Sequence, residues 1–179
     1  MAKIERPKAR KEYKCFKCGE TIKVGDTYLK GIPFRRSPII RCTKCGLRSW
    51  ELSSSDYVLG VGRVCDCWQE DYELGENTAQ CIADELDSIK DQCQDSLDNM
   101  PEGLQEGSTG ELLQERIDCL DDVISELENI DYDSIKEEAQ TDFDSEFEEG
   151  TPEYQNELEG EIETQLTDAI NEALSQLDY

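Results

Sequence analysis

Histidine is absent from the 179-residue chain, and this absence excludes several classes of function. Hydrolases with a histidine base, Cys-His dyads, zinc sites with imidazole ligands and HExxH metalloproteases all need an imidazole group. Nucleases of the HNH type need it as well. We therefore expect a protein that is not an enzyme.

Long apolar runs are also missing. No stretch approaches the ~18 uncharged apolar residues of a membrane-spanning helix, and the opening residues MAKIERPKARK contain no apolar core of a secretory signal. We expect a cytoplasmic protein without membrane contact. In that compartment the nine cysteines are thiols or metal ligands rather than a disulfide framework, and an odd number could not pair completely.

Basic residues are scarce overall, and most of them lie at one end of the chain. Lys and Arg number 18 against 43 Asp and Glu, which gives a formal net charge of -25. Residues 1–50 hold 14 of the basic residues and four acids, a net charge of +10, whereas residues 51–179 carry -35. Because a uniformly acidic protein would not have so basic an N-terminal segment, we expect two modules with separate partners.

Four cysteines of the basic segment form two copies of the motif CxxCG, Cys15 with Cys18 and Cys42 with Cys45. Two thiolates three residues apart in a tight turn can bind one metal ion, and the glycine after each motif supplies the positive φ that closes the turn. Two such turns complete a tetrahedral four-thiolate site, so we expect one structural Zn²⁺. A thioredoxin-like redox role would need a βαβ context, which neither copy has.

The residues between the two motifs predict β structure. Residues 21–29 alternate and break at Gly25, which predicts a β-hairpin, and residues 37–41 predict a further strand. Together with the doubled motif, this pattern resembles the zinc-ribbon and treble-clef fingers over residues 13–50. The resemblance implies a small α+β module stabilised by zinc, in families whose members bind DNA, RNA or proteins.

Two versions of this finger stay open. A second turn that ends in Gly46 favours the ribbon, whereas a helix that starts near Cys45 and runs through Trp50 would favour the treble clef. In either version the zinc could serve folding alone, because ~40 residues cannot build a sufficient apolar core.

Basic residues outside the motifs are candidates for contact with nucleic acid or a partner protein. The candidate set, which includes one aromatic residue, is Arg6, Lys8, Arg10, Lys11, Phe34, Arg35 and Arg36. We expect the aromatic residues Tyr13, Phe16 and Trp50 of the same module nearby, a composition that suits phosphate contact and base stacking. Protein docking and neutralisation within the chain are the alternatives.

The acidic part of the chain is predicted to be helical. Apolar residues recur at three- and four-residue steps, which predicts helices over residues 54–74, 78–99, 109–131 and 152–178. Heptad spacing in the second and third helices predicts an antiparallel hairpin or coiled coil within an all-α bundle. The segment from 131 to 150 is a short helix or a connection. The expected domains are a basic N-terminal arm (1–12), the finger (13–52) and an acidic helical domain (53–179).

Polar residues mark the starts of these helices. The segment LSSSD at residues 52–56 predicts a cap for the first helix, and Asn77 predicts the cap of the second. Ser108 with Glu111 three residues later predicts a capping box at the start of the third helix. Thr151 followed by proline predicts the start of the last helix.

Five cysteines lie outside the doubled motif: Cys65, Cys67, Cys81, Cys93 and Cys119. Cys93 falls on an apolar stripe and is most simply a core residue. Cys65 and Cys67 are two residues apart on a predicted helix and do not face one another, so a second metal site would require a break in that helix.

Acidic residues of the predicted hairpin form a candidate acidic surface: Asp84, Asp87, Asp91, Asp95, Glu115, Asp118, Asp122 and Glu126. The simplest interpretation is a solvated face. After Lys90 and Arg116 are subtracted, the two helices carry a net 12 negative charges. Along a rod of ~30 Å this is one charge per ~2.5 Å. Duplex DNA carries one charge per ~1.7 Å. In charge alone this resembles the acidic nucleic-acid-mimic inhibitors that bacteriophages make. Spread along helices, these acids do not converge as a two-metal nuclease site requires.

These features predict a non-enzymatic regulator or accessory factor, for which a phage origin would fit. Its expected partner is a nucleic-acid-handling protein complex with a basic surface, and nucleic acid itself is a further candidate for the basic segment. The first alternative is an acidic nucleic-acid mimic that inhibits a host DNA- or RNA-binding protein. The second is a structural or assembly protein that forms homo-oligomers through a coiled coil.

Overall fold

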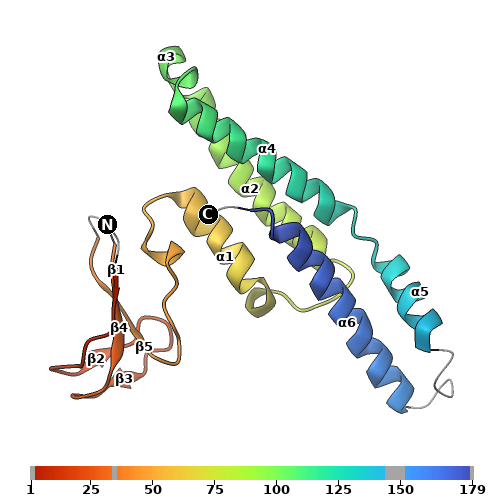
Figure 1. Ribbon diagram of the computed structural model, residues 1–179, viewed down its shortest axis with the longest axis horizontal. Helices are drawn as coiled ribbons and strands as arrows, with labels where there is room; N and C mark the ends of the chain where they lie inside the picture. Colours follow the sequence, from red (N-terminus) through yellow and green to blue (C-terminus); the bar gives the residue numbers. More distant parts are fainter. Residues whose placement is uncertain (1–2, 34–35, 144–151, 178–179) are drawn as a thin grey trace. The chain divides into compact units, whose positions relative to one another are not determined.

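The computed structural model describes residues 3–33, 36–143 and 152–177 (Figure 1). It is mixed α and β, with small antiparallel sheets first in the chain and helices after them. The chain divides into two compact units, which we call the N-terminal unit (1–62) and the C-terminal unit (63–178). The division falls inside helix α1 (Asp56–Asp71), later than the boundary expected near residue 52, because the side chain of Trp50 lies directly against Gly62.

Five short strands build the N-terminal unit. Strands β1 (Lys3–Glu5), β4 (Tyr28–Ile32) and β5 (Ile39–Cys42) form one antiparallel sheet in the order β1-β4-β5. Strands β2 (Tyr13–Lys14) and β3 (Thr21–Ile22) form a separate pair. The hairpin expected over residues 21–29 is therefore wrong, because its two halves belong to different sheets.

The turn at Gly25 shows why the hairpin does not form. Gly25 has a φ of +93°, and its N–H donates to the carbonyl of Ala9 at 2.8 Å. The N–H of Ala9 donates in turn to the carbonyl of Asp26 at 2.8 Å. The turn is thus bonded to an earlier part of the chain, and the strand that follows it pairs with β1.

Residues 3–9 belong to the sheet and do not form a separate basic arm. In β1, Ile4 lies opposite Gly31 of β4. The N–H of Tyr28 donates to the carbonyl of Pro7 at 3.1 Å, and Ala9 is only 3% exposed. The basic side chains of this segment are therefore attached to an ordered backbone.

One apolar cluster of the N-terminal unit contains Ala9, Cys15, Ile22, Tyr28 and Cys42. Two of these five residues belong to the CxxCG motifs, so the cysteines are part of this buried cluster. On the other face of β4, a Cβ atom at Gly31 would lie 2.4 Å from a methyl of Leu52 and 2.7 Å from one of Leu47, so a larger residue there would displace these leucine side chains.

Helices build the C-terminal unit. Besides the second part of α1 they are α2 (Thr78–Asp98), the short α3 (Glu102–Gln105), α4 (Ser108–Glu128), α5 (Tyr132–Phe143) and α6 (Pro152–Leu174). Helices α2 and α4 lie side by side, α4 also contacts α6, and α5 packs on α6 (Figure 1). The indole N–H of Trp68 on α1 donates to Asn171 Oδ1 at 3.1 Å, which ties α1 to α6. None of the helices described is long and apolar enough to cross a membrane.

The apolar stripes predicted for these helices are buried, as their periodicity requires. On α2 and α4, the residues Ile82, Leu86 and Leu120 have no exposed surface, and Leu127 is 1% exposed. On α6, Ile170 is fully buried. The 3.6-residue period therefore identifies the faces correctly.

The cap predicted for α1 is confirmed, whereas the capping box predicted for α4 is wrong. Ser55 Oγ accepts a bond from the N–H of Val58 at 3.5 Å at the start of α1. Helix α4, however, begins at Ser108, and Gly107 occupies the N-cap position without a side-chain bond. Ser108 therefore lies in the first turn, and no capping box forms.

At the start of α2, the side-chain hydrogen bonds are made by Thr78 and not by the predicted cap, Asn77. Asn77 makes no capping bond with its side chain. The hydroxyl of the buried Thr78 accepts a bond from the N–H of Gly75 at 2.8 Å and donates to the carbonyl of Glu73 at 2.9 Å. Thr151, the predicted cap of α6, lies outside the described residues.

Substitution of Gly110 by alanine is expected to destabilise the C-terminal unit. A Cβ atom there would lie 1.9 Å from the backbone carbonyl oxygen of Gln105, which is held because its side chain donates to the carbonyls of Leu97 and Met100. We expect a loss of roughly 1–3 kcal/mol in the free energy of unfolding, measured by denaturant titration. The control is Gly103→Ala in α3, where a Cβ meets nothing within 4 Å and helix propensity favours alanine. Equal stability of the two variants would contradict the close packing of α3 on α4.

Candidate metal centre and charged surfaces

The four cysteines of the CxxCG motifs lie together. The Sγ atoms of Cys15, Cys18, Cys42 and Cys45 all lie within 4.8 Å of one another. Cys18 Sγ and Cys42 Sγ are 3.8 Å apart. Two vertices of a tetrahedron with Zn–S bonds of ~2.3 Å are about 3.8 Å apart, so this pair already has the spacing of bound thiolates. The cysteines are therefore positioned to bind one metal ion, as the motif spacing predicts.

The two turns that carry the ligands have the same construction. Cys15 and Cys18 lie in the turn between β2 and β3, while Cys42 ends β5 and Cys45 lies in the turn after it. The following glycines have φ values of +71° at position 19 and +67° at position 46. Side chains with a Cβ rarely adopt this conformation, so the predicted role of both glycines is confirmed.

Hydrogen bonds tie the first turn to β5. The N–H of Phe16 donates to the carbonyl of Ile40 at 2.9 Å. The N–H of Cys42 donates to Cys15 Sγ at 3.3 Å. These bonds hold the two pairs of ligands at a fixed separation.

The thiols of the cluster do not titrate alike. Burial raises the pKa of Cys15, but the backbone N–H groups of Cys18, Cys42 and Lys17 outweigh it and lower that pKa to about 6. Hydrogen bonds with the thiols of Cys42 and Cys18 raise the pKa of Cys45 to about 12. A metal ion that binds here must displace protons from the cluster, so its apparent affinity falls as the pH falls.

Four sulfur donors select the class of metal. Soft thiolates in a tetrahedral arrangement suit Zn²⁺ or iron, whereas Mg²⁺ and Ca²⁺ prefer oxygen ligands. A four-thiolate site of this kind has no open position for a substrate. Within the described part of the chain, no other group of three metal-ligating side chains converges.

The five other cysteines lie in the helices. Cys93 is buried, as expected for a core residue. Burial raises the pKa of the Cys65 thiol to about 12, which makes it a poor nucleophile. The thiol of Cys119 donates to the carbonyl of Gln176 at 3.6 Å. Cys81 is exposed.

The predicted basic contact residues are exposed where the structure describes them. These are Arg6, Lys8, Arg10, Lys11 and Arg36. Phe34 and Arg35 lie outside the described residues. Lys11 Nζ is 5.5 Å from the centre of the Tyr13 ring, a cation–π distance. The N-terminal unit has 14 basic and six acidic residues, a net charge of +8, and the remaining residues carry -33.

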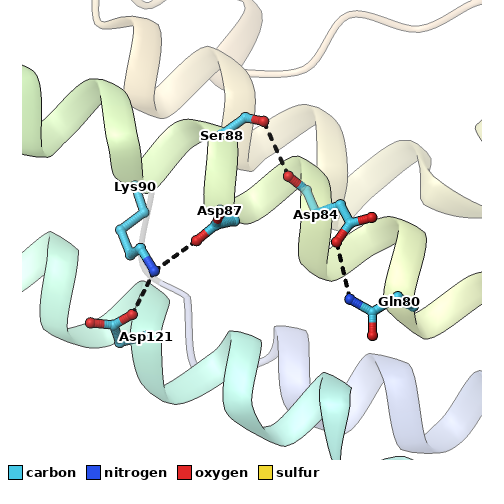
Figure 2. A network of polar contacts seen from close by, with 6 residues as sticks. All are labelled: Gln80, Asp84, Asp87, Ser88, Lys90 and Asp121. Carbon is cyan, nitrogen blue, oxygen red and sulfur yellow. Dashed lines mark hydrogen bonds and ion pairs between the residues drawn. The ribbon is translucent and has the colours of Figure 1, made fainter.

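The predicted acidic surface is exposed on α2 and α4. All eight of its members, Asp84, Asp87, Asp91, Asp95, Glu115, Asp118, Asp122 and Glu126, are solvent-accessible. Figure 2 shows that the acids nearest Lys90 are partly neutralised: its Nζ lies 2.7 Å from Asp87 and 2.8 Å from Asp121. These two carboxylates raise the pKa of Lys90, which links α2 to α4. Asp121 was not among the predicted residues, because its partner lies 31 positions away in the chain.

Comparisons with protein-family models, curated proteins and solved structures give no match for this chain. The cysteine cluster and the charged surfaces are therefore the features that bear on its function.

Proposed function

We propose that this protein is a non-enzymatic zinc-finger interaction protein that acts as a regulator or accessory factor on a nucleic-acid-handling protein complex. The observation that carries the proposal is the segregation of charge between the two units, +8 against -33, with a four-thiol cluster at the centre of the basic one. A complex that handles nucleic acid offers both a basic protein surface and a polyanion, and so suits each unit.

Zinc is the metal that fits this role. Four thiolates around a closed site are typical of structural zinc, and two of the four cysteines lie in a buried cluster that such an ion would stabilise. No helix starts near Cys45 in the described chain: the next helical residues are the short η1 (Trp50–Leu52) and then α1. This supports a finger of the zinc-ribbon type over a treble clef.

The acidic unit favours a protein target over free duplex DNA. Charges that lie within a Debye length of ~8–10 Å repel the phosphates of a duplex. Exposed carboxylates such as Asp91 and Asp95 would instead be attracted to a basic protein surface. The same exposure supports the second candidate function, in which α2 and α4 act as an acidic nucleic-acid mimic and inhibit a DNA- or RNA-binding protein.

Affinity purification with paired charge reversals tests the proposal. The intact protein is purified, with its partners, from a nuclease-treated lysate of cells that produce it. Two variants are purified in the same way: Lys8→Glu/Arg10→Glu changes exposed residues of the N-terminal unit, and Asp91→Lys/Asp95→Lys changes exposed residues of the C-terminal unit. We expect a nucleic-acid-binding protein complex with the native chain and a several-fold loss with either variant. Loss with the Asp variant alone would favour the mimic. Recovery of partners that do not handle nucleic acid would overturn both.

A further inference from the structure

Among the aromatic side chains of the N-terminal unit that the structure describes, Phe16 is the most exposed. Tyr13 packs on Tyr28, with ring centres 5.1 Å apart. Trp50 packs against Gly62, where a Cβ would lie 2.5 Å from the indole. Phe16 is different, because 65% of its surface is exposed, the largest fraction among the exposed large hydrophobic residues that the structure describes.

The backbone of Phe16 is fixed although its ring is in solvent. Phe16 lies between the ligands Cys15 and Cys18, and its N–H is bonded to the carbonyl of Ile40 at 2.9 Å. The turn is closed by a bond of 2.9 Å from the N–H of Gly19 to the carbonyl of Cys15. A ring on so constrained a turn loses little conformational entropy when it binds a ligand.

Two ammonium groups flank Phe16. Lys14 and Lys17 lie on either side of it in sequence, and both are exposed. In the turn itself, Glu20 is compensated by Lys44, whose Nζ lies 3.5 Å from its carboxylate. An exposed ring between ammonium groups matches what single-stranded nucleic acid offers, which is unstacked bases on an anionic backbone.

We propose that Phe16 is a stacking platform for a base of single-stranded nucleic acid, with Lys14 and Lys17 in contact with its phosphates. The inference deepens the function proposed above, because it names the nucleic acid that the basic unit takes within such a complex. A single strand is favoured over a duplex because bases in a duplex are already stacked on both faces.

Fluorescence anisotropy with short labelled oligo-dT and oligo-U tests the inference on the intact, zinc-loaded protein. We expect Phe16→Ala to weaken binding about 10-fold or more, and Phe16→Trp to retain it. The matched control is Val24→Ala, because Val24 is 64% exposed in the same unit and should not change the affinity. Lys14→Gln/Lys17→Gln should reduce the salt dependence of binding, whereas Phe16→Ala should leave its slope unchanged.

Two results would overturn the stacking role. One is the absence of oligonucleotide binding by the native chain, and the other is equal binding by Phe16→Ala and Val24→Ala. If the purified partner complex is lost with Phe16→Ala while oligonucleotide binding is unchanged, Phe16 is a protein contact instead. The proposed function is tested by the purification, so it can stand where the stacking role fails.

Discussion

Removal of the metal is expected to unfold the N-terminal unit and to leave the helices of the C-terminal unit in place. Cys15 and Cys42 are two of the five residues in one buried cluster of this unit and belong to the proposed ligand set, so chelation should disrupt that cluster. Structural zinc contributes roughly 10–16 kcal/mol to the folding of small metal-bound domains, which is as large as the whole stability of many domains. Elemental analysis should find one zinc per chain. After chelation, amide signals of residues 3–52 should collapse in NMR spectra while helical circular dichroism is retained.

A pair of cysteine variants separates the metal site from general effects of cysteine loss. Cys42→Ser/Cys45→Ser should abolish bound zinc and reproduce the effect of chelation. Cys81→Ser/Cys119→Ser changes the same number of thiols in the C-terminal unit and should keep both the zinc and the fold. Unchanged zinc content in the first variant would contradict the ligand assignment. Loss of helicity on chelation would mean that the two units share one core.

The metal centre could be predicted because its signals are local in sequence. Each CxxCG motif specifies a turn, and the positive φ of Gly19 and Gly46 is what the motif requires. The burial of Leu86 and Ile170 follows from helical periodicity in the same way. Information within a few turns of chain is sufficient for features of this kind.

The strand pairing could not be predicted, because it depends on contacts that are distant in the chain. The alternation of residues 21–29 fits a hairpin, yet Gly25 bonds to Ala9 and β4 pairs with a three-residue strand at the start of the chain. A strand as short as Lys3–Glu5 has no alternation that a sequence pattern could reveal. The capping box predicted at Ser108 does not form, because the helix begins one residue earlier, with Gly107 at the N-cap.

The sequence predicted which charged residues are exposed, but not which aromatic side chains are packed or which charges are paired. Tyr13, Phe16 and Trp50 look equivalent in a sequence, and only the structure shows that two of them are packed and one is exposed. Likewise, the sequence shows how many acids α2 and α4 carry, but it does not show that Lys90 pairs with both Asp87 and Asp121. Exposure and pairing are properties of the tertiary structure, so a charge count overstates how much of a surface is available to a partner.

Truncation of Leu120 is expected to cost the C-terminal unit more stability than any truncation on the outer face of α4. Leu120 has no exposed surface and lies on the face of α4 that packs along α2. Leu120→Ala removes three buried carbon atoms and leaves a cavity, which should lower the free energy of unfolding by roughly 2–5 kcal/mol in a denaturant titration followed by circular dichroism.

Leu112→Ala is the matched control, because it is the same substitution in the same helix at a residue that is 45% exposed. Its expected effect lies within about 0.5 kcal/mol, since little apolar surface returns to water. If Leu112→Ala proved as costly as Leu120→Ala, and the cost rose with protein concentration, the outer face of α4 would be covered by a second chain in solution. That outcome would favour the assembly protein over a regulator that acts through exposed acids, because the same contact would bury part of α4 that the acidic surface needs. Equal and small effects would instead contradict the packing of α4 on α2.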